Sequence, residues 1–112
     1  MLSTYSLGLL SEYIAAAFLT FKGYKILKLR YRNVMGEIDL VARKGNTFVF
    51  VEIKTIKQSS EFPAVGPRQI ARIKRCAELY LSQKNIYEQA PARFDLITIS
   101  WPFRIKHYRN VF

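Results

Sequence analysis

Cysteine, histidine and acidic residues are scarce in this chain of 112 residues. Cys76 is the single cysteine, His107 is the single histidine, and only 8 residues are Asp or Glu. One cysteine excludes an intrachain disulfide and a zinc site built on several cysteines, and it fits a reducing environment. We therefore expect a cytoplasmic protein.

Long hydrophobic runs are also missing. No segment approaches the length of a membrane-spanning helix. The apolar N-terminal stretch has no early basic region and is interrupted by Glu12, so it does not resemble a signal peptide. We expect no association with a membrane.

Positive charge, in contrast, is plentiful. The chain has 18 Lys and Arg residues against 8 acids, a formal net charge of +10 that is spread along its whole length. A globular domain this basic suits a polyanionic partner. Nucleic acid is the leading candidate, and ribosomal RNA or a membrane surface would satisfy the same charge.

The length and the hydrophobic pattern predict one domain, residues 1–112, with elements in the order α-β-β-β-α-β. The predicted elements are a helix at 5–22, strands at 24–32, 37–42 and 47–55, a helix from 67 to about 84, and a strand at 94–100. The sequence also allows a short last strand near 103–108, without requiring it. Such elements pack economically as a mixed α/β sheet flanked by helices.

Each predicted helix has a face that we expect to meet the sheet. In the first helix, helical spacing gives the apolar stripe Leu7, Leu10, Ile14, Phe18 and Phe21. In the second helix, the core-facing residues are Ile70, Ile73, Ala77, Tyr80 and Leu81. Arg68, Arg72 and Arg75 share another face of the second helix, where they are either phosphate contacts or solvated side chains.

The chemistry is concentrated on the two strands that flank the turn Arg43–Asn46. Glu37 and Asp39 should share one face of their strand, with Ile38 and Leu40 opposite, because strand side chains alternate. Glu52 and Lys54 share a face likewise. A two-residue turn places Asp39 across from Glu52, and a four-residue loop places Glu37 there; both registers gather three carboxylates and one lysine.

Such a cluster needs compensation, because like charges facing one another across a sheet are destabilising. The strand of Glu52 is apolar on both sides of that residue, which predicts burial and raises the cost. Mg²⁺ would compensate, since it binds a few carboxylates together with phosphate oxygens, and Lys54 would neutralise the cluster or assist at the phosphate. The alternative is a solvated face with an ordinary ion pair between Glu37 and Lys54.

The Asp, then Glu-x-Lys, pattern on adjacent strands resembles the core of the restriction-endonuclease-like nucleases. Over nearly the whole chain the sequence is similar to the YraN-like family, uncharacterised proteins with an endonuclease-like fold. The matching pieces are Glu12, Gly23-Tyr24, Ile26-Leu27, Arg32, Gly36-Glu37-Ile38-Asp39-Leu40, Phe50-Val51-Glu52-Ile53-Lys54, Arg93-Phe94-Asp95, and His107 with Asn110-Val111-Phe112. Two positions depart from the family pattern: Ile56 replaces an arginine and Gln69 replaces a lysine, which implies weaker phosphate contacts.

The resemblance implies a single restriction-endonuclease-like domain that hydrolyses phosphodiester bonds of DNA with Mg²⁺ or Mn²⁺. The implied catalytic residues are Glu37, Asp39, Glu52 and Lys54. The implied metal ligands are Glu37, Asp39 and Glu52, joined by Glu12, since the chain is also similar to archaeal Holliday-junction resolvases, in which a helix glutamate joins the strand acids. The candidate nucleic-acid contacts are Arg30, Arg32, Lys57, Arg68, Arg72 and Arg75.

Three functions stay open from the sequence. The first is an endonuclease on branched or flapped DNA, for which cutting two strands symmetrically would favour a homodimer. The second is a non-catalytic nucleic-acid-binding protein with the same fold, and the third is an RNA-directed module. For Asp95 and His107 we predict structural roles.

Overall fold

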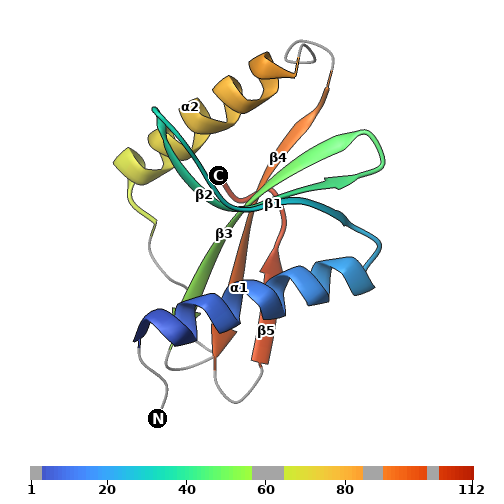
Figure 1. Cartoon of the computed structure of the whole chain (residues 1–112), viewed down its shortest axis with the longest axis vertical. Coiled ribbons are helices and arrows are strands. Elements are labelled where there is room, and N and C mark those ends of the chain that lie inside the picture. Colours follow the sequence, from blue (N-terminus) through green and yellow to red (C-terminus); the bar gives the residue numbers. More distant parts are fainter. Residues whose placement is uncertain (1–3, 57–64, 85–89, 101–103) are drawn as a thin grey trace.

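A five-stranded sheet lies between two helices in the computed structural model, which describes residues 4–56, 65–84, 90–100 and 104–112 (Figure 1). The elements are α1 (Thr4–Phe21), β1 (Lys25–Asn33), β2 (Gly36–Lys44), β3 (Thr47–Ile56), α2 (Pro67–Gln83), β4 (Ala92–Ser100) and β5 (Arg104–Tyr108). This confirms the predicted mixed α/β class and the element order, and β5 adds the short last strand.

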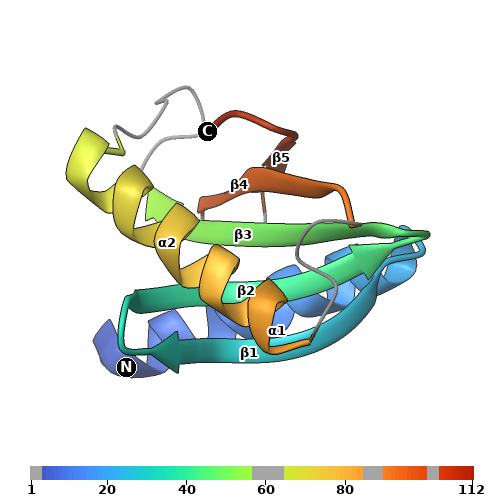
Figure 2. The same cartoon turned by 90° about the horizontal axis from the view of Figure 1, so that it is seen from above.

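The strands are arranged in the order β1-β2-β3-β4-β5. Neighbours are antiparallel except β3 and β4, which are parallel. A parallel pair needs a crossover connection, and α2 supplies it. Figure 2 shows α1 and α2 on opposite faces of the sheet, so β3, at the centre, is covered on both sides.

Two hydrophobic clusters hold these layers together. The α1-side cluster is built around Ala15, Leu19, Leu40, Val51 and Ile97, together with their buried neighbours. The α2-side cluster includes Ile38, Val41, Phe50, Cys76 and Tyr80. Because β3 contributes alternate residues to both clusters, its apolar run is buried on both faces, as the sequence predicts.

The predicted buried face of α1 is only partly correct, because Ile14 and Phe18 pack against the α1-side cluster but Leu10 and Phe21 do not. Ser11, Ala15 and Leu19 are the residues that bury, whereas Leu10 is 37% exposed and Phe21 is 96% exposed. The helix is apolar on most sides, so periodicity could not orient it, and the small residues Ser11 and Ala15 let its backbone approach the sheet. Despite this apolar character, no helix in the described ranges is long and hydrophobic enough to cross a membrane.

The predicted faces of α2 are confirmed. Its buried residues are Ile73, Cys76, Ala77, Tyr80 and Leu81, and Ile70 is partly buried. Arg68, Arg72 and Arg75 are all exposed. The helix therefore presents apolar side chains to the sheet and a row of guanidinium groups to solvent.

Side-chain alternation is interrupted partway along the paired strands β1 and β2. Leu29 and Leu40 are paired and pack on the α1 side, yet Tyr31 and Ile38, the next pair along the ladder, pack on the α2 side. Between these pairs stands Arg30 with a φ of 52°, a left-handed conformation that non-glycine residues rarely adopt. The expectation that Ile38 and Leu40 share a face is therefore wrong, and the interruption lies opposite Asp39.

A buried polar cluster around Asp95 holds the C-terminal residues against the sheet. The Asp95 carboxylate is fully buried and accepts hydrogen bonds from Arg93, from His107 Nε2 at 2.7 Å and from the backbone N–H of Asn110 at 2.9 Å. These bonds outweigh the opposing effect of burial and lower the pKa of Asp95. His107 also contacts Lys22 Nζ beyond the end of α1, at 2.8 Å. Asp95 and His107 thus have structural surroundings, as predicted.

Candidate active site

The site begins where the β2–β3 ladder ends. The hairpin has Lys44 opposite Thr47, the register of a two-residue turn, and its pairing runs as far as Leu40 opposite Val51. Beyond that point the Asp39 Oδ2 atom accepts the Ile53 backbone N–H at 2.8 Å. A side-chain carboxylate therefore takes over from a strand carbonyl, which fixes the orientation of Asp39 and lets the two strands separate.

Glu52 lies beside this opening on the α2 side. Its side chain is only 8% exposed, and Lys54 Nζ lies 3.6 Å from Glu52 Oε2. The Gln69 side-chain amide donates a hydrogen bond to the same Glu52 oxygen from the first turn of α2. Glu52 is thus held from its own strand and from the helix above.

The ionisation of Glu52 is strongly perturbed. Burial, reinforced by the adjacent Asp39 carboxyl and partly opposed by Lys54, raises its pKa to about 8. A carboxyl with this pKa carries a proton at neutral pH. The Asp39–Glu52 pair then shares a hydrogen bond in place of two repelling charges.

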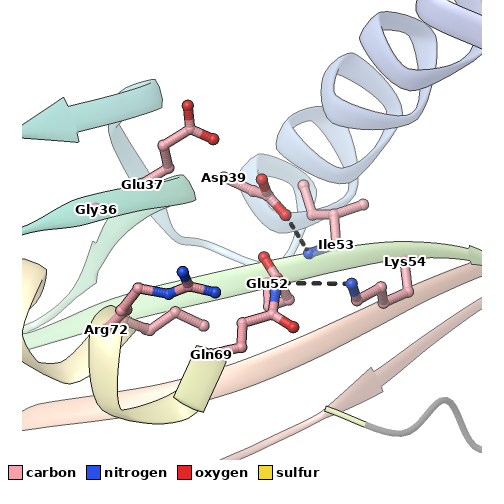
Figure 3. A pocket seen from close by; sticks show the side chains of 9 residues that line it. Gly36, Glu37, Asp39, Glu52, Ile53, Lys54, Gln69 and Arg72 are labelled. Carbon is pink, nitrogen blue, oxygen red and sulfur yellow. Dashed lines mark hydrogen bonds and ion pairs between the residues drawn. The ribbon is translucent and has the colours of Figure 1, made fainter. Parts of the chain in front are cut away.

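Around these groups lies a polar cavity of about 510 Å³ between β2, β3 and α2 (Figure 3). This volume is within the range of small-molecule and cofactor sites. The lining residues are Gly36, Glu37, Asp39, Glu52, Ile53, Lys54, Gln69, Arg72 and Ile73. Three carboxyl residues, an ammonium and a guanidinium therefore line one volume.

The other two predicted acids are directed elsewhere. Glu37 forms an ion pair with Arg32 and, in Figure 3, points away from Glu52. Glu12 forms an ion pair with Arg30 Nε at 2.9 Å. Burial, partly opposed by Arg30, raises the pKa of Glu12.

Glu12 and Arg30 belong to a second hollow of about 470 Å³ between α1 and the β1–β2 hairpin. Glu37 and Asp39 line this hollow as well as the first, so Asp39 stands on the wall between them. Within the part of the chain that the structure describes, no three carboxylate, histidine or cysteine side chains converge as a metal-binding group. The structure thus brings Asp39, Glu52 and Lys54 together and leaves Glu37 and Glu12 bound to arginines.

The predicted basic residues are divided in the same way. Arg72 lines the cavity, and Arg68 and Arg75 lie on the exposed face of α2. Arg30 and Arg32 carry the ion pairs just described, while Lys57 lies outside the described residues.

Gln69 is the site residue that sequence reasoning treated only as a departure from a family pattern. In the structure its amide holds Glu52. The available signal was helical spacing: Gln69 precedes Ile73, a predicted core residue, by one helical turn and therefore faces the sheet.

Comparison with known proteins agrees with the resemblance read from the motifs. A UPF0102 protein of Rhizobium etli is 40% identical over 107 residues, which cover 94% of this chain and 87% of that protein. A UPF0102 protein of Syntrophus aciditrophicus is 42% identical over 97 residues, covering 83% and 75% respectively. Among solved structures, the crystal structure of SSO0001 has a TM-score of 0.48 at 20% identity, covering 96% of this chain and 52% of that one.

The family profile spans most of the described fold. It matches residues 11–99, from the middle of α1 to the end of β4, and so includes every residue that lines the cavity beside Asp39 and Glu52. The chain belongs to Uncharacterised protein family UPF0102.

Proposed function

We propose that this protein is a nuclease that hydrolyses phosphodiester bonds of DNA with the help of Mg²⁺ or Mn²⁺. The observation that carries the proposal is the Asp39–Glu52 pair, held beside Lys54 at the point where β2 and β3 separate. Placing the half-buried Asp39 beside the buried Glu52 is unfavourable, and such carboxyl pairs are typical of catalytic sites. The exposed arginines nearby and the net charge of +10 suit a nucleic-acid substrate.

The donor set fits a small hard cation. Mg²⁺ is usually held by one or two carboxylates with waters and substrate phosphates completing its shell, and a closed protein cage is not required. Asp39 and Glu52 would hold the ion, with Glu37 at the rim of the same cavity. A bound divalent ion supplies neutralisation of phosphate charge and a lower pKa for its water.

The chain's own residues have distinct tasks in this proposal. The Ile53 N–H and the Gln69 amide fix the two carboxyls, so that little reorganisation is needed when substrate arrives. Lys54, whose side chain is 35% exposed, presents its ammonium to the phosphate or to the attacking water. Arg72 reaches the same cavity and would hold a phosphate oxygen of the backbone.

The test is cleavage of labelled single-stranded, duplex, flap and four-way-junction DNA and of single-stranded RNA, each with Mg²⁺, Mn²⁺ or EDTA. We compare wild type with Asp39→Ala and with Glu78→Gln, a control that removes an exposed acid of α2. Metal-dependent cutting should disappear in Asp39→Ala and persist in Glu78→Gln, while both variants still bind DNA.

Other outcomes identify the alternatives. Tight binding without cutting under every condition would indicate a non-catalytic nucleic-acid-binding protein. Preference for RNA would favour an RNA-directed role. A requirement for a homodimer, which symmetric cutting of two strands would need, is read from light scattering of the active species.

A further inference from the structure

The turn between β1 and β2 has side chains that a hairpin turn rarely uses. Asn33 pairs with Gly36, which leaves Val34 and Met35 as its two corner residues. Two-residue hairpin turns favour Asn, Asp and Gly, because these residues tolerate the backbone angles and the solvent. Here Val34 is 90% exposed and Met35 is 44% exposed. Departures from local turn chemistry are expected mainly at functional positions.

The turn is also firmly held, despite its exposed corner residues. The Asn33 side chain accepts the Met35 backbone N–H at 2.8 Å and donates to the Cys76 carbonyl of α2 at 3.1 Å. Cys76 Sγ in turn donates to the Gly36 carbonyl at 3.4 Å. Both ends of the turn are therefore bound to α2, and Val34 and Met35, which we name the apolar tip, project from a fixed base.

Three arginines and two glutamates lie around the apolar tip, with Glu37 paired to Arg32. Arg32 precedes the turn, and its side chain is 75% exposed. Arg72 lies against Gly36, since a methyl group added there would stand 3.6 Å from Arg72 Cβ. Arg75, Glu78 and Met35 line the same shallow hollow. An apolar projection with more arginines than acids around it suits DNA, in which apolar bases stack inside an anionic backbone.

We infer that the apolar tip is a wedge that enters DNA at an already disrupted base step while the surrounding arginines hold the flanking phosphates. Methionine is among the apolar side chains that proteins insert between base steps. Opening an intact step has an unstacking cost, which is smaller at a mismatch, a nick or a branch. The tip therefore selects DNA that is branched or otherwise opened.

The distance between the apolar tip and the candidate site predicts where the DNA would be cut. Met35 precedes Asp39 by four residues of β2, which at 3.3 Å per residue is roughly 13 Å. One strand of DNA advances 3.4 Å per nucleotide, so the cut should fall about four nucleotides from the opened step. This length rests on the proposed nuclease function, whereas the wedge itself can be tested by binding alone.

The binding experiment uses wild type, the double variant Val34→Ser with Met35→Ser, and Phe21→Ser. Phe21 is 96% exposed at the far end of α1, so its variant controls for the loss of surface apolarity (Figure 1). Affinities are measured in EDTA for an intact duplex, the same duplex with one mismatch, and a four-way junction. A 2-aminopurine beside the mismatch reports unstacking by its fluorescence.

Wild type and Phe21→Ser should prefer the opened DNAs and increase the fluorescence. In the double variant, the preference for opened DNA over intact duplex should fall roughly tenfold, which is the effect of withdrawing one apolar side chain from a buried contact. Its affinity for intact duplex should stay unchanged. Thermal melting should be the same for all three proteins, since the substituted residues are exposed. An unchanged preference in the double variant overturns the inference, and so does wild type that binds no DNA.

Two further results distinguish the wedge from the proposed nuclease function and from self-association of the protein. If wild type prefers opened DNA through the tip but cuts nothing with Mg²⁺ or Mn²⁺, the wedge stands and the proposed nuclease function fails. If wild type self-associates and the double variant does not, the tip is a contact between protein chains and the inference is wrong.

Discussion

Asp39 and Glu52 show how single residues are prepared for chemistry here. Each carboxyl is fixed by a hydrogen bond from a different element, Asp39 by the Ile53 N–H of β3 and Glu52 by the Gln69 amide of α2. Substituting either donor should disturb the pair without touching the acids themselves. Gln69 is the better target, because a backbone N–H cannot be removed without altering the strand.

Gln69→Ala should weaken Mn²⁺ binding, measured by calorimetry, and metal-dependent cleavage by about 10- to 100-fold, the usual effect of removing a partner that orients a ligand. Gln69→Lys keeps a donor at this position and should recover most of the loss. DNA affinity in EDTA should be equal in wild type and Gln69→Ala. A fall in DNA affinity as large as the fall in metal affinity would mean that Gln69 contacts phosphate instead.

The sequence predicted which two strands carry the candidate site better than which acids converge there. The hairpin between β2 and β3 and the burial of Glu52 followed from turn composition and from the apolar run of β3, whereas the sequence left two registers open and the structure has that of the two-residue turn. The positions of Glu37 and Glu12 did not follow. They depend on Arg30, whose left-handed backbone interrupts the alternation of side chains opposite Asp39. An arginine at that position does not predict such a conformation.

At the scale of elements, α1 departs furthest from its prediction. Strand bounds followed from short apolar runs separated by turn residues, and the amphipathic pattern of α2 oriented that helix correctly. The pattern of α1 could not do the same, because large apolar side chains occur around most of its circumference. Residue size does not orient the helix either, because Ala15 is fully buried whereas Ala17, of equal size, is exposed two residues later.

This difference gives a matched pair of substitutions. Ala15→Leu should lower the free energy of unfolding by about 1–3 kcal/mol, because the larger side chain has no room between helix and sheet. Ala17→Leu should change it by less than about 0.5 kcal/mol, since that position faces solvent. Urea unfolding measures both, and equal effects would show that α1 packs on the sheet through another face.

For the whole molecule, the buried Asp95 cluster joins parts of the chain that are far apart in sequence. It links β4 with β5, the residues after β5, and the end of α1 through His107 and Lys22. Its stability depends on pH in a defined direction. Since the pKa of Asp95 is lower in the folded chain than its ordinary value of 3.8, the folded state binds fewer protons than the unfolded state in this range.

Wild type should therefore keep the full contribution of Asp95 above about pH 4 and lose it as the pH falls further, through the lowered pKa of the folded state. Asp95→Asn should lower the free energy of unfolding at pH 6 by about 3 kcal/mol, because Arg93 and His107 lose their buried partner. Its stability should also decline less than that of wild type between pH 4 and pH 2. Parallel curves for the two proteins in circular dichroism melts would contradict this account.

The bond between Asp39 and the Ile53 N–H also makes the backbone a sensor of the carboxylate. Strand amides normally exchange with solvent deuterium only when neighbouring strands part, but the Ile53 amide is protected by a side chain that belongs to the site. Any ligand that draws the Asp39 carboxylate toward itself changes both the exchange rate and the chemical shift of this one amide. A single nuclear magnetic resonance signal, far from the termini, thus reports occupancy of the site without an assay of its chemistry.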